Sequence, residues 1–468
     1  MDLTVLTIGE AAAALRRGDF SAAAYADALL ARTATLATLN AFIHHDAQQV
    51  RAAARTADER RASGAALGAL HGVPLALKDN LDTAGIATTA GTPGLRNNRP
   101  LRNAPVVQRL LDAGAIVFGK ASLHELAYGI TNHNAAFGAV RNPYDPTRIP
   151  GGSSGGVGAA VGARMVAGGI GSDTGGSVRI PAALCGVVGF RPSTGRWPQT
   201  GIVPISHTRD TAGPMARSVA DCVLLDRVVT GSTDAPAISL QGLRLGVPRG
   251  HFWEHLDDEV AAPMASVLRL LREHGAVLVE ADIADAPRLD AEAGFAIALY
   301  ETVVDLDDYL AQHGSPLRYP ELVAQVASPD VKGLLQGLLG DGAVPQAAYR
   351  HALDTLRPQL QAAYGRYFQE HGVAAMVFPT TPLPAVPIGH DETVRLNGQA
   401  VPTFATFIRN CSAATVAGIP GISLPAATTR AGLPLGLELD APRHDDARLL
   451  AIARAVEAVL PAMPPPSC

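Results

Sequence analysis

Residues 151–177 read GGSSGGVGAAVGARMVAGGIGSDTGGS and contain two glycine-serine nests, at 151–156 and 171–177. Glycine at this density indicates backbone in tight turns, in close packing or at positive φ. Ser153 in the first nest and Ser177 in the second are 24 residues apart. The stretch therefore predicts close-packed backbone around candidate serine hydroxyls.

The first nest has two simple interpretations. A flexible turn stays open on the residues alone. A phosphate cradle is disfavoured, because the nest lacks both the Gly-Lys-Ser/Thr ending of a P-loop and the G-x-G-x-x-G spacing after a strand.

Ser154 also stands in a G-x-S-x-G pattern, which is the nucleophile elbow of α/β-hydrolases. His444 and Asp445 would be the candidates to complete its triad. The elbow requires a strand directly before the serine, but residues 142–150 contain three prolines, which exclude a central strand. The elbow is therefore disfavoured.

Outward from the nests, strand and helix signals alternate, as is typical of the α/β class. Residues 7–63 read as helices, with Gly18 as a stop and Ser21 as an N-cap. Residues 285–371 also read as mostly helical. The other expected strands are 73–78, 115–118, 243–248, 276–280, 375–378, 421–425 and 435–440, and the other expected helices are 104–113, 257–274 and 445–460.

No internal repeat or low-complexity linker divides the chain, so we expect a single domain over residues 1–468. Within it we expect an N-terminal helical layer at 1–64 and a catalytic core at 65–230. We expect a helical peripheral subregion at 285–371 and a return to the core at 372–468.

Composition narrows the class of partner. With 47% hydrophobic and 17% charged residues, the chain can build a large core. Its net charge is −5 and its pI is near 6.3, so it lacks the basic face that nucleic acid or an anionic membrane would require. A small-molecule substrate fits this composition better.

Cysteines and the N-terminus bear on location. The four cysteines, at 185, 222, 411 and 468, have no C-x-x-C pair, so we expect neither a zinc site nor a disulfide framework. The first ten residues lack the basic and apolar regions of a secretory signal. No apolar run reaches the ~18 residues needed to span a bilayer. We expect a cytoplasmic protein.

Three motifs together resemble the amidase signature family. Val73–Asn80 comes first, then the nest at 151–156, then Asp173–Pro181, in the family's order and with its serine separation. The resemblance runs nearly end to end. It implies a large, mixed, twisted β-sheet covered by helices on both faces, and a catalytic set of Lys78, Ser153 and Ser177 with a cis peptide before Ser153. It implies no cofactor and no metal.

The chemistry of amide hydrolysis explains why serine and lysine would stand at these positions. A serine hydroxyl is a poor nucleophile until a base takes its proton. Lysine can serve only where burial lowers its pKa towards neutrality. Lys78 follows an apolar strand, and only three of the 38 basic residues are lysines, so a buried amine is expected there. Ser153 would relay the proton from Ser177, the nucleophile, to Lys78.

The second nest would stabilise the developing oxyanion. By the resemblance, the backbone N–H groups of Thr174, Gly175, Gly176 and Ser177 form the oxyanion hole. Losing one such donor typically lowers the rate by about 10²- to 10³-fold. Asp173 and Arg179 flank the nucleophile, and we expect them to brace the loop through hydrogen bonds.

Three further residues are interpreted as structural. Lys120 also ends a strand and is expected to be a surface or strand-end lysine. Lys332 lies in a charged loop. Cys185 follows the nucleophile closely but has no candidate base nearby, so we expect a buried apolar thiol.

The resemblance also indicates a substrate class. Residues 124–129, 190–197, 201–208 and 331–333 are most similar to the bacterial indoleacetamide and mandelamide hydrolases, which implies an arylacetamide cleaved to acid and ammonia. Such a substrate requires an apolar slot with few polar anchors. By family position, Ala127, Tyr128 and Gly129 would line the acyl pocket. Phe404 and Ile408 are either pocket or core residues.

Other functions stay open at this point. The chain could be the amidase subunit of a glutamine-dependent amidotransferase, or an amidase for anilides or carbamates. A non-catalytic binding protein is disfavoured, because all three catalytic positions are intact. A homodimer is the default expectation for a soluble enzyme.

Overall fold

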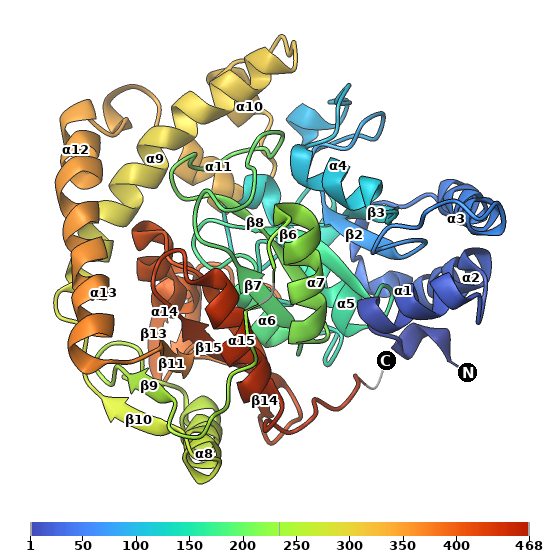
Figure 1. Cartoon of the computed structure of the whole chain (residues 1–468). Coiled ribbons are helices and arrows are strands. Elements are labelled where there is room, and N and C mark those ends of the chain that lie inside the picture. The colour runs from blue at the N-terminus through green and yellow to red at the C-terminus, as the bar shows by residue number, and fades with distance from the viewer. Residues whose placement is uncertain (1, 234, 467–468) are drawn as a thin grey trace.

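The computed structural model describes residues 2–233 and 235–466. Its centre is one eleven-stranded sheet in the order β1-β3-β2-β6-β8-β7-β14-β15-β11-β9-β10 (Figure 1). The strands are β1 (Phe42–His44), β2 (Pro74–Lys78), β3 (Ile116–Ala121), β6 (Gly168–Asp173), β7 (Val188–Arg191), β8 (Thr211–Ala216), β9 (Arg244–Val247), β10 (Val277–Glu280), β11 (Ala375–Pro379), β14 (Gly421–Thr428) and β15 (Pro434–Asp440).

The sheet is mixed. Strand β2 pairs in parallel with both β3 and β6, and β9 pairs in parallel with β10 and β11. The strands from β6 to β11 across the centre pair antiparallel. Two small hairpins lie apart: β4 (His133–Asn134) with β5 (Gly138–Ala139), and β12 (Thr393–Leu396) with β13 (Gln399–Pro402).

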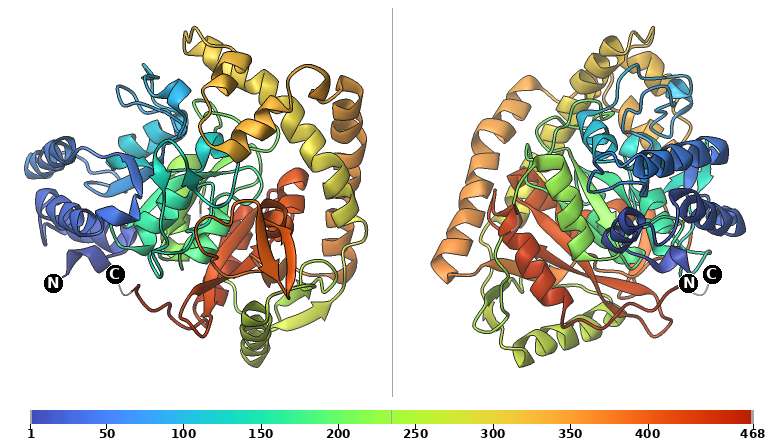
Figure 2. Two further views of the ribbon diagram at one scale, coloured as in Figure 1. Left: turned by 180° about the vertical axis from the view of Figure 1, so that it is seen from behind. Right: turned by 45° about the vertical axis from the view of Figure 1, so that its right-hand side comes forward.

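Helices cover both faces of the sheet (Figures 1 and 2). Helices α5 (Gly155–Gly162) and α6 (Arg179–Leu184) pack together against the central strands, and α14 (Thr403–Ala417) packs against α6. Helices α4 (Pro105–Asp112), α7 (Val219–Thr230) and α15 (Asp446–Glu457) pack together, with α7 and α15 against β7, β8, β14 and β15. Helix α8 (Asp258–Glu273) lies along β10, β11 and β14.

The N-terminal layer is joined to this sheet. It contains α1 (Ile8–Arg17), α2 (Ala22–Thr35) and α3 (Ala47–Ala62). The short strand β1 between α2 and α3 pairs antiparallel with β3. Segments 1–64, 65–230 and 372–468 thus all contribute strands to one sheet.

Glycine makes the centre of the sheet thin enough for α5 to lie on it. A Cβ at Gly169 on β6 would lie 2.6 Å from the Ala76 carbonyl oxygen and 2.9 Å from Val157 on α5. A Cβ at Gly171 would lie 2.7 Å from Ser154 Oγ. All three contacts are too short for any side chain. These glycines therefore let the two serine nests approach each other.

Segment 285–371 is helical, as expected. It contains α9 (Ala286–Gln312), α10 (Tyr319–Ala324), α11 (Pro329–Gln336), α12 (Gln346–His351) and α13 (Arg357–His371), with a π-helical turn between the last two. Helix α9 packs against both α13 and α14. We expected this segment to be peripheral, but α9 and α11 also wall the site described below.

The described residues contain neither a membrane-spanning helix nor a disulfide. No helix in residues 2–233 and 235–466 has the length and apolar character of a bilayer-crossing segment. Cys185, Cys222 and Cys411 are buried free thiols, and Cys468 lies outside the described residues.

Candidate active site

The ends of two neighbouring strands and the loop before α5 bring the three expected catalytic residues together. Lys78 is the last residue of β2, and Ser177 lies in the loop after β6, the strand beside β2. Ser153 precedes α5 and follows a cis peptide at Gly152-Ser153, as the resemblance implied. Ser154 N donates to Ser177 O at 3.2 Å, which ties the two nests together.

Lys78 is fully buried and has three oxygen neighbours. Its Nζ lies 2.8 Å from Ser153 Oγ, 2.9 Å from Ser172 Oγ and 3.4 Å from Ser172 O. Asn80 Nδ2 also donates to Ser172 Oγ, at 3.0 Å, and holds it in place. A neutral amine has two N–H donors and one lone pair, so Ser172 can accept both donors while the lone pair faces the Ser153 hydroxyl.

The surroundings of Lys78 favour that neutral form. Burial lowers the pKa of Lys78 to about 7, with the charges of Asp173 and Asp210 opposing the shift. The adjacent carboxylate, Asp79, forms its ion pair with Lys120 instead, at 3.2 Å. Lys78 therefore lacks the carboxylate partner that would hold it as an ammonium ion.

The expected relay also requires a hydrogen bond between Ser153 and Ser177, and this bond is not formed in the structure. No hydrogen bond joins Ser153 Oγ to Ser177 Oγ in the described part of the chain, and the Ser177 hydroxyl has no partner there. Ser177 instead lines the cavity described below. Catalytic hydrogen bonds are often long in unliganded enzymes and tighten when substrate binds.

The loop after β6 is folded around the Asp173 carboxylate. Asp173 Oδ1 accepts from Gly176 N at 2.8 Å, and Oδ2 accepts from Val178 N at 3.2 Å and Arg179 Nε at 3.1 Å. The Gly176 N–H is therefore already engaged. Of the four expected oxyanion donors, three remain without an acceptor among the described residues: the N–H groups of Thr174, Gly175 and Ser177.

A buried charge network supports this loop. Arg179 NH1 donates to Glu438 at 2.7 Å, and Arg191 NH1 donates to the Asp173 carbonyl oxygen at 2.6 Å. Burial alone would raise the pKa of Asp173, but the two guanidinium groups outweigh it and hold that pKa well below its usual range. The shape of the loop is thus set by buried charged side chains, and these side chains do not line the cavity.

We expect Arg179→Met to destabilise the fold by about 3–5 kcal/mol, because it leaves buried Glu438 without its cation and removes one of the two guanidinium groups beside Asp173. Urea unfolding followed by circular dichroism measures the change. The matched control is Arg51→Met, which breaks the exposed pair with Asp27 and should change the free energy of unfolding by less than about 1 kcal/mol. Equal small changes in both variants would contradict the assigned role of Arg179.

Two structural interpretations are tested by the geometry. Lys120 is not a surface lysine: its side chain is fully buried, and Nζ donates to Leu81 O at 2.8 Å and Thr88 Oγ1 at 2.9 Å besides pairing with Asp79. Its polar partners make this burial tolerable, and the strand context alone could not reveal them. Burial raises the pKa of the Cys185 thiol, so it is an apolar core residue.

The nucleophile elbow is contradicted. No strand directly precedes Ser154, and its hydroxyl donates to Ser172 O at 3.2 Å and not to a histidine. His444 N donates instead to Ser193 Oγ, at 2.9 Å.

A cavity of about 460 Å³ opens above the second nest, large enough for a small organic ligand. Thr174, Gly175 and Ser177 form one part of its lining. The remaining wall comes from residues 124–131 and 205–209, from α9, α11 and α14, and from His251 and Asp391. It includes the three expected pocket residues, Ala127, Tyr128 and Gly129, and also Phe404 and Ile408, which the sequence left open between pocket and core.

The turn that carries three of these residues has an unusual backbone. Leu126 and Ala127 adopt φ values of 51° and 66°, in the left-handed region that non-glycine residues seldom occupy. Such conformations concentrate at ligand sites, where the surrounding structure enforces them. Tyr128 turns its hydroxyl to Thr302 Oγ1 on α9, 2.5 Å away.

Large apolar side chains are partly exposed along the cavity lining, which also contains the partly exposed carboxylates Asp330 and Asp391. Phe295 on α9 and Phe404 on α14 have ring centroids 6.3 Å apart, and both rings are partly exposed, with 49% and 39% of their surface accessible. Leu334 on α11 lies at the same opening. Exposed aromatic pairs at the rim of a cavity are typical of a ligand-binding surface.

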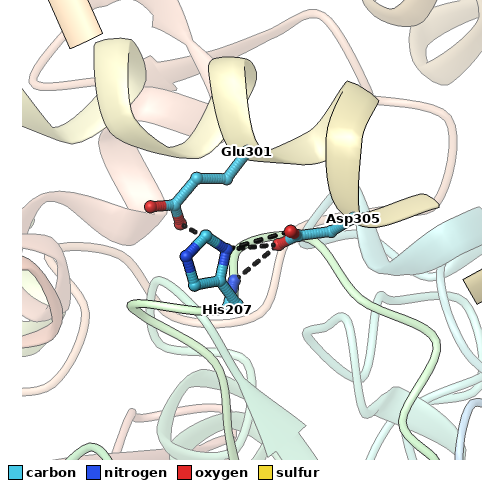
Figure 3. A group of neighbouring side chains, drawn as sticks. All are labelled: His207, Glu301 and Asp305. Carbon is cyan, nitrogen blue, oxygen red and sulfur yellow. Dashed lines mark hydrogen bonds and ion pairs between the residues drawn. The ribbon is translucent and has the colours of Figure 1, made fainter. Parts of the chain in front are cut away.

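The loop at 205–209 is anchored to α9 by His207, Glu301 and Asp305 (Figure 3). These are the only described residues grouped like metal ligands. However, Asp305 accepts from His207 N at 2.7 Å and His207 Nδ1 at 2.9 Å, and Glu301 accepts from Ser206, Thr208 and Tyr349. Their oxygens already have protein donors, so we interpret the group as an anchor.

Comparison with known proteins identifies the class of enzyme. The family described as Amidase matches residues 25–450. The chain belongs to the amidase signature family. Among curated relatives, an indoleacetamide hydrolase of Agrobacterium vitis is 44% identical over 447 residues, covering 95% of this chain and 94% of that protein. A mandelamide hydrolase of Pseudomonas putida is 40% identical, covering 99% of this chain and 93% of that protein.

Solved structures agree with this assignment to the amidase signature family. A crystal structure of an amidase superposes with a TM-score of 0.87 at 32% identity, covering 97% of this chain and 100% of that one. The peptide amidase of Stenotrophomonas maltophilia gives a TM-score of 0.84 at 31% identity, covering 99% and 98%. The predicted family and fold are confirmed, and the chain is an amide hydrolase.

Proposed function

We propose that this amidase hydrolyses a small arylacetamide to the carboxylic acid and ammonia through an acyl-enzyme on Ser177. The observation that carries the mechanism is the hydrogen-bond arrangement at Lys78. Nζ lies within 3.4 Å of Ser153 Oγ, Ser172 Oγ and Ser172 O, so a neutral amine can donate both protons to Ser172 and turn its lone pair to the Ser153 hydroxyl. An amine so placed, with a pKa of about 7, is a base ready at neutral pH.

The steps follow from these positions. As Ser177 Oγ attacks the amide carbonyl, its proton passes to Ser153 Oγ, and the Ser153 proton passes to Lys78 Nζ. The free N–H groups of Thr174, Gly175 and Ser177 receive the oxyanion. The proton then returns through Ser153 to the leaving nitrogen, ammonia departs, and water hydrolyses the acyl-enzyme by the same relay.

Two features support an aryl acyl group. The Phe295 and Phe404 rings at the mouth favour stacking with an aromatic ring. Relatives named for indoleacetamide and mandelamide match almost the whole chain. An amidotransferase subunit would instead bind glutamine, which has no aromatic ring to pack against Phe295 and Phe404.

We expect ammonia release from indole-3-acetamide, mandelamide or phenylacetamide with a kcat/KM at least ~10²-fold above that for L-glutamine, because glutamine has no aromatic ring to pack against Phe295 and Phe404 and its two charged groups lose hydration on binding. The purified chain alone is assayed with a coupled ammonia detection. A p-nitroanilide, followed by the absorbance of the released p-nitroaniline, and an aryl carbamate, followed by the released phenol, are included to test those alternatives. Preferential hydrolysis of glutamine would favour the amidotransferase role and contradict the proposal.

A further inference from the structure

Asp290 differs from the other two carboxylates of the cavity in its partners. Asp330 accepts from His124 Nε2 at 3.0 Å. Asp391 accepts from Thr131 Oγ1 and His133 Nδ1, each at 2.7 Å. Asp290 has a single hydrogen bond, from Ser412 Oγ to its Oδ1 at 2.9 Å. Its second oxygen has no donor in the described part of the chain.

The nearest cation does not supply the missing donor. Arg209 also lines the cavity, but its NH1 donates to Gly294 O at 2.6 Å and its NH2 to Thr415 Oγ1 at 2.8 Å. No ion pair within 4.0 Å joins it to Asp290 among the described residues. Burial raises the pKa of Asp290, since Arg209 and Ser412 offset only part of the desolvation.

Asp290 faces the space where a substrate must lie. The residues of α9 that line the cavity include Pro287, Asp290, Ala291, Gly294 and Phe295, at the i+3 and i+4 spacing of one helix face. The absent side chain at Gly294 leaves room here, because a Cβ would lie 3.1 Å from Asp290 Oδ1 and 3.5 Å from Arg209 NH1.

The partner of Asp290 lies close to the nucleophile loop. Ser412 follows Cys411, whose Cβ would be 2.8 Å from a Cβ at Gly176. Gly176 directly precedes Ser177. Asp290 and Ser412 also line the same cavity as Ser177, so the pair can meet the acyl part of a bound amide.

We propose that Asp290, oriented by Ser412, is the residue that selects substrates carrying an uncharged N–H or O–H donor on their acyl part. This inference rests on the proposed arylacetamide hydrolase function and adds a polar criterion to it. The donor can be a ring N–H, as in an indole, or an α-hydroxyl, as in mandelamide. Both present the same chemistry to the free carboxylate oxygen.

The physical basis is an unsatisfied acceptor. When a bound substrate displaces water from the cavity, Asp290 Oδ2 loses its solvent partners. A substrate with a donor replaces them, whereas one without leaves a charged acceptor unpaired. Sites of this kind reject the analogue that lacks the donor. A hydrogen bond to a charged group corresponds to a discrimination of about 10- to 100-fold.

The test compares matched substrate pairs by kcat/KM for ammonia release. One pair is indole-3-acetamide and 1-benzothiophene-3-acetamide, which differ in the ring N–H. The other is mandelamide and phenylacetamide, which differ in the α-hydroxyl. We expect the native protein to favour the donor-bearing member of at least one pair by about 10-fold or more, and that pair identifies which donor is recognised.

Asp290→Ala should reduce this preference to about 1, and Asp290→Asn, which keeps a neutral acceptor, should give an intermediate value. Asp391→Asn is the matched control, since Asp391 already has two donors, and should leave the preference unchanged. Should Asp290→Ala fail to fold, Ser412→Ala is expected to lower the preference in the same direction.

Two failures are distinguishable. If the native protein hydrolyses the arylacetamides without preference, or if the Asp290 and Ser412 variants keep the native preference, the inference is wrong while the proposed function stands. If the native protein releases no ammonia from any of the four amides, the proposed function itself fails.

Discussion

Ser177→Ala is expected to abolish turnover, with a loss of about 10⁶-fold in kcat, the size seen when a serine hydrolase loses its nucleophile. Ser177 is the only serine of the two nests that lines the cavity. Its hydroxyl has no protein partner to replace, so the substitution should leave the fold intact. Steady-state ammonia release measures the loss, and circular dichroism checks the fold.

Labelling with a fluorophosphonate provides the control. The native protein and Ser154→Ala should both be labelled at Ser177, because the Ser154 hydroxyl is buried against Ser172. Ser177→Ala should not be labelled. A tryptic peptide that carries the label on Ser154 would restore the elbow interpretation and contradict the assignment of the nucleophile.

Lys78→Ala should lower kcat/KM by about 10²- to 10⁴-fold at pH 7, the usual contribution of a general base. Lys78→Arg should fall as far, because arginine keeps the positive charge but cannot act as a base near neutrality. Retention of full activity by either variant would contradict the relay.

The kcat/KM of the native protein is expected to depend on pH through the protonation of Lys78. Only neutral Lys78 can accept a proton, so in the native protein kcat/KM should rise about tenfold per pH unit below the pKa of about 7 and level off above it. The residual activity of Lys78→Ala should not show this rise. A native profile that falls with increasing pH between 6 and 8 would contradict the assignment.

Local signals in the sequence predicted the outer parts of the fold well. The helix expected at 7–17 is α1, because Thr7 and Glu10 form a capping box and Gly18 ends it at a φ of 79°. The strand expected at 73–78 is β2, a fully buried apolar run. Such elements depend on residues within one turn or one strand.

The centre of the sheet could not be predicted in this way. Strand β6 reads GGIGSD, which has neither alternation nor β-branched residues at most positions. Its glycines are set by the approach of α5 and β2, a tertiary contact that leaves no local pattern. Helix α14 was missed too, although two of its residues, Phe404 and Ile408, were singled out as pocket candidates.

The residues of the candidate site were also predictable only in part. Its three expected catalytic positions stand in motifs and could be placed from the sequence. Ser172 and Asp290 could not, because their contacts join residues 94 and 122 positions apart. Ser172 lies in the second glycine-serine nest, but the sequence did not predict its contact with Lys78. Asp290 lay in a helical segment interpreted as peripheral.

Lys78 is expected to lose its proton near neutral pH, and lysine NMR tests this most directly. The chain has only three lysines, Lys78, Lys120 and Lys332, so ¹³Cε-labelled protein gives few resonances to assign. The Lys78 signal is identified by its loss in Lys78→Met. We predict that it titrates near pH 7. A Lys78 signal that keeps its ammonium shift up to pH 9 would contradict the account.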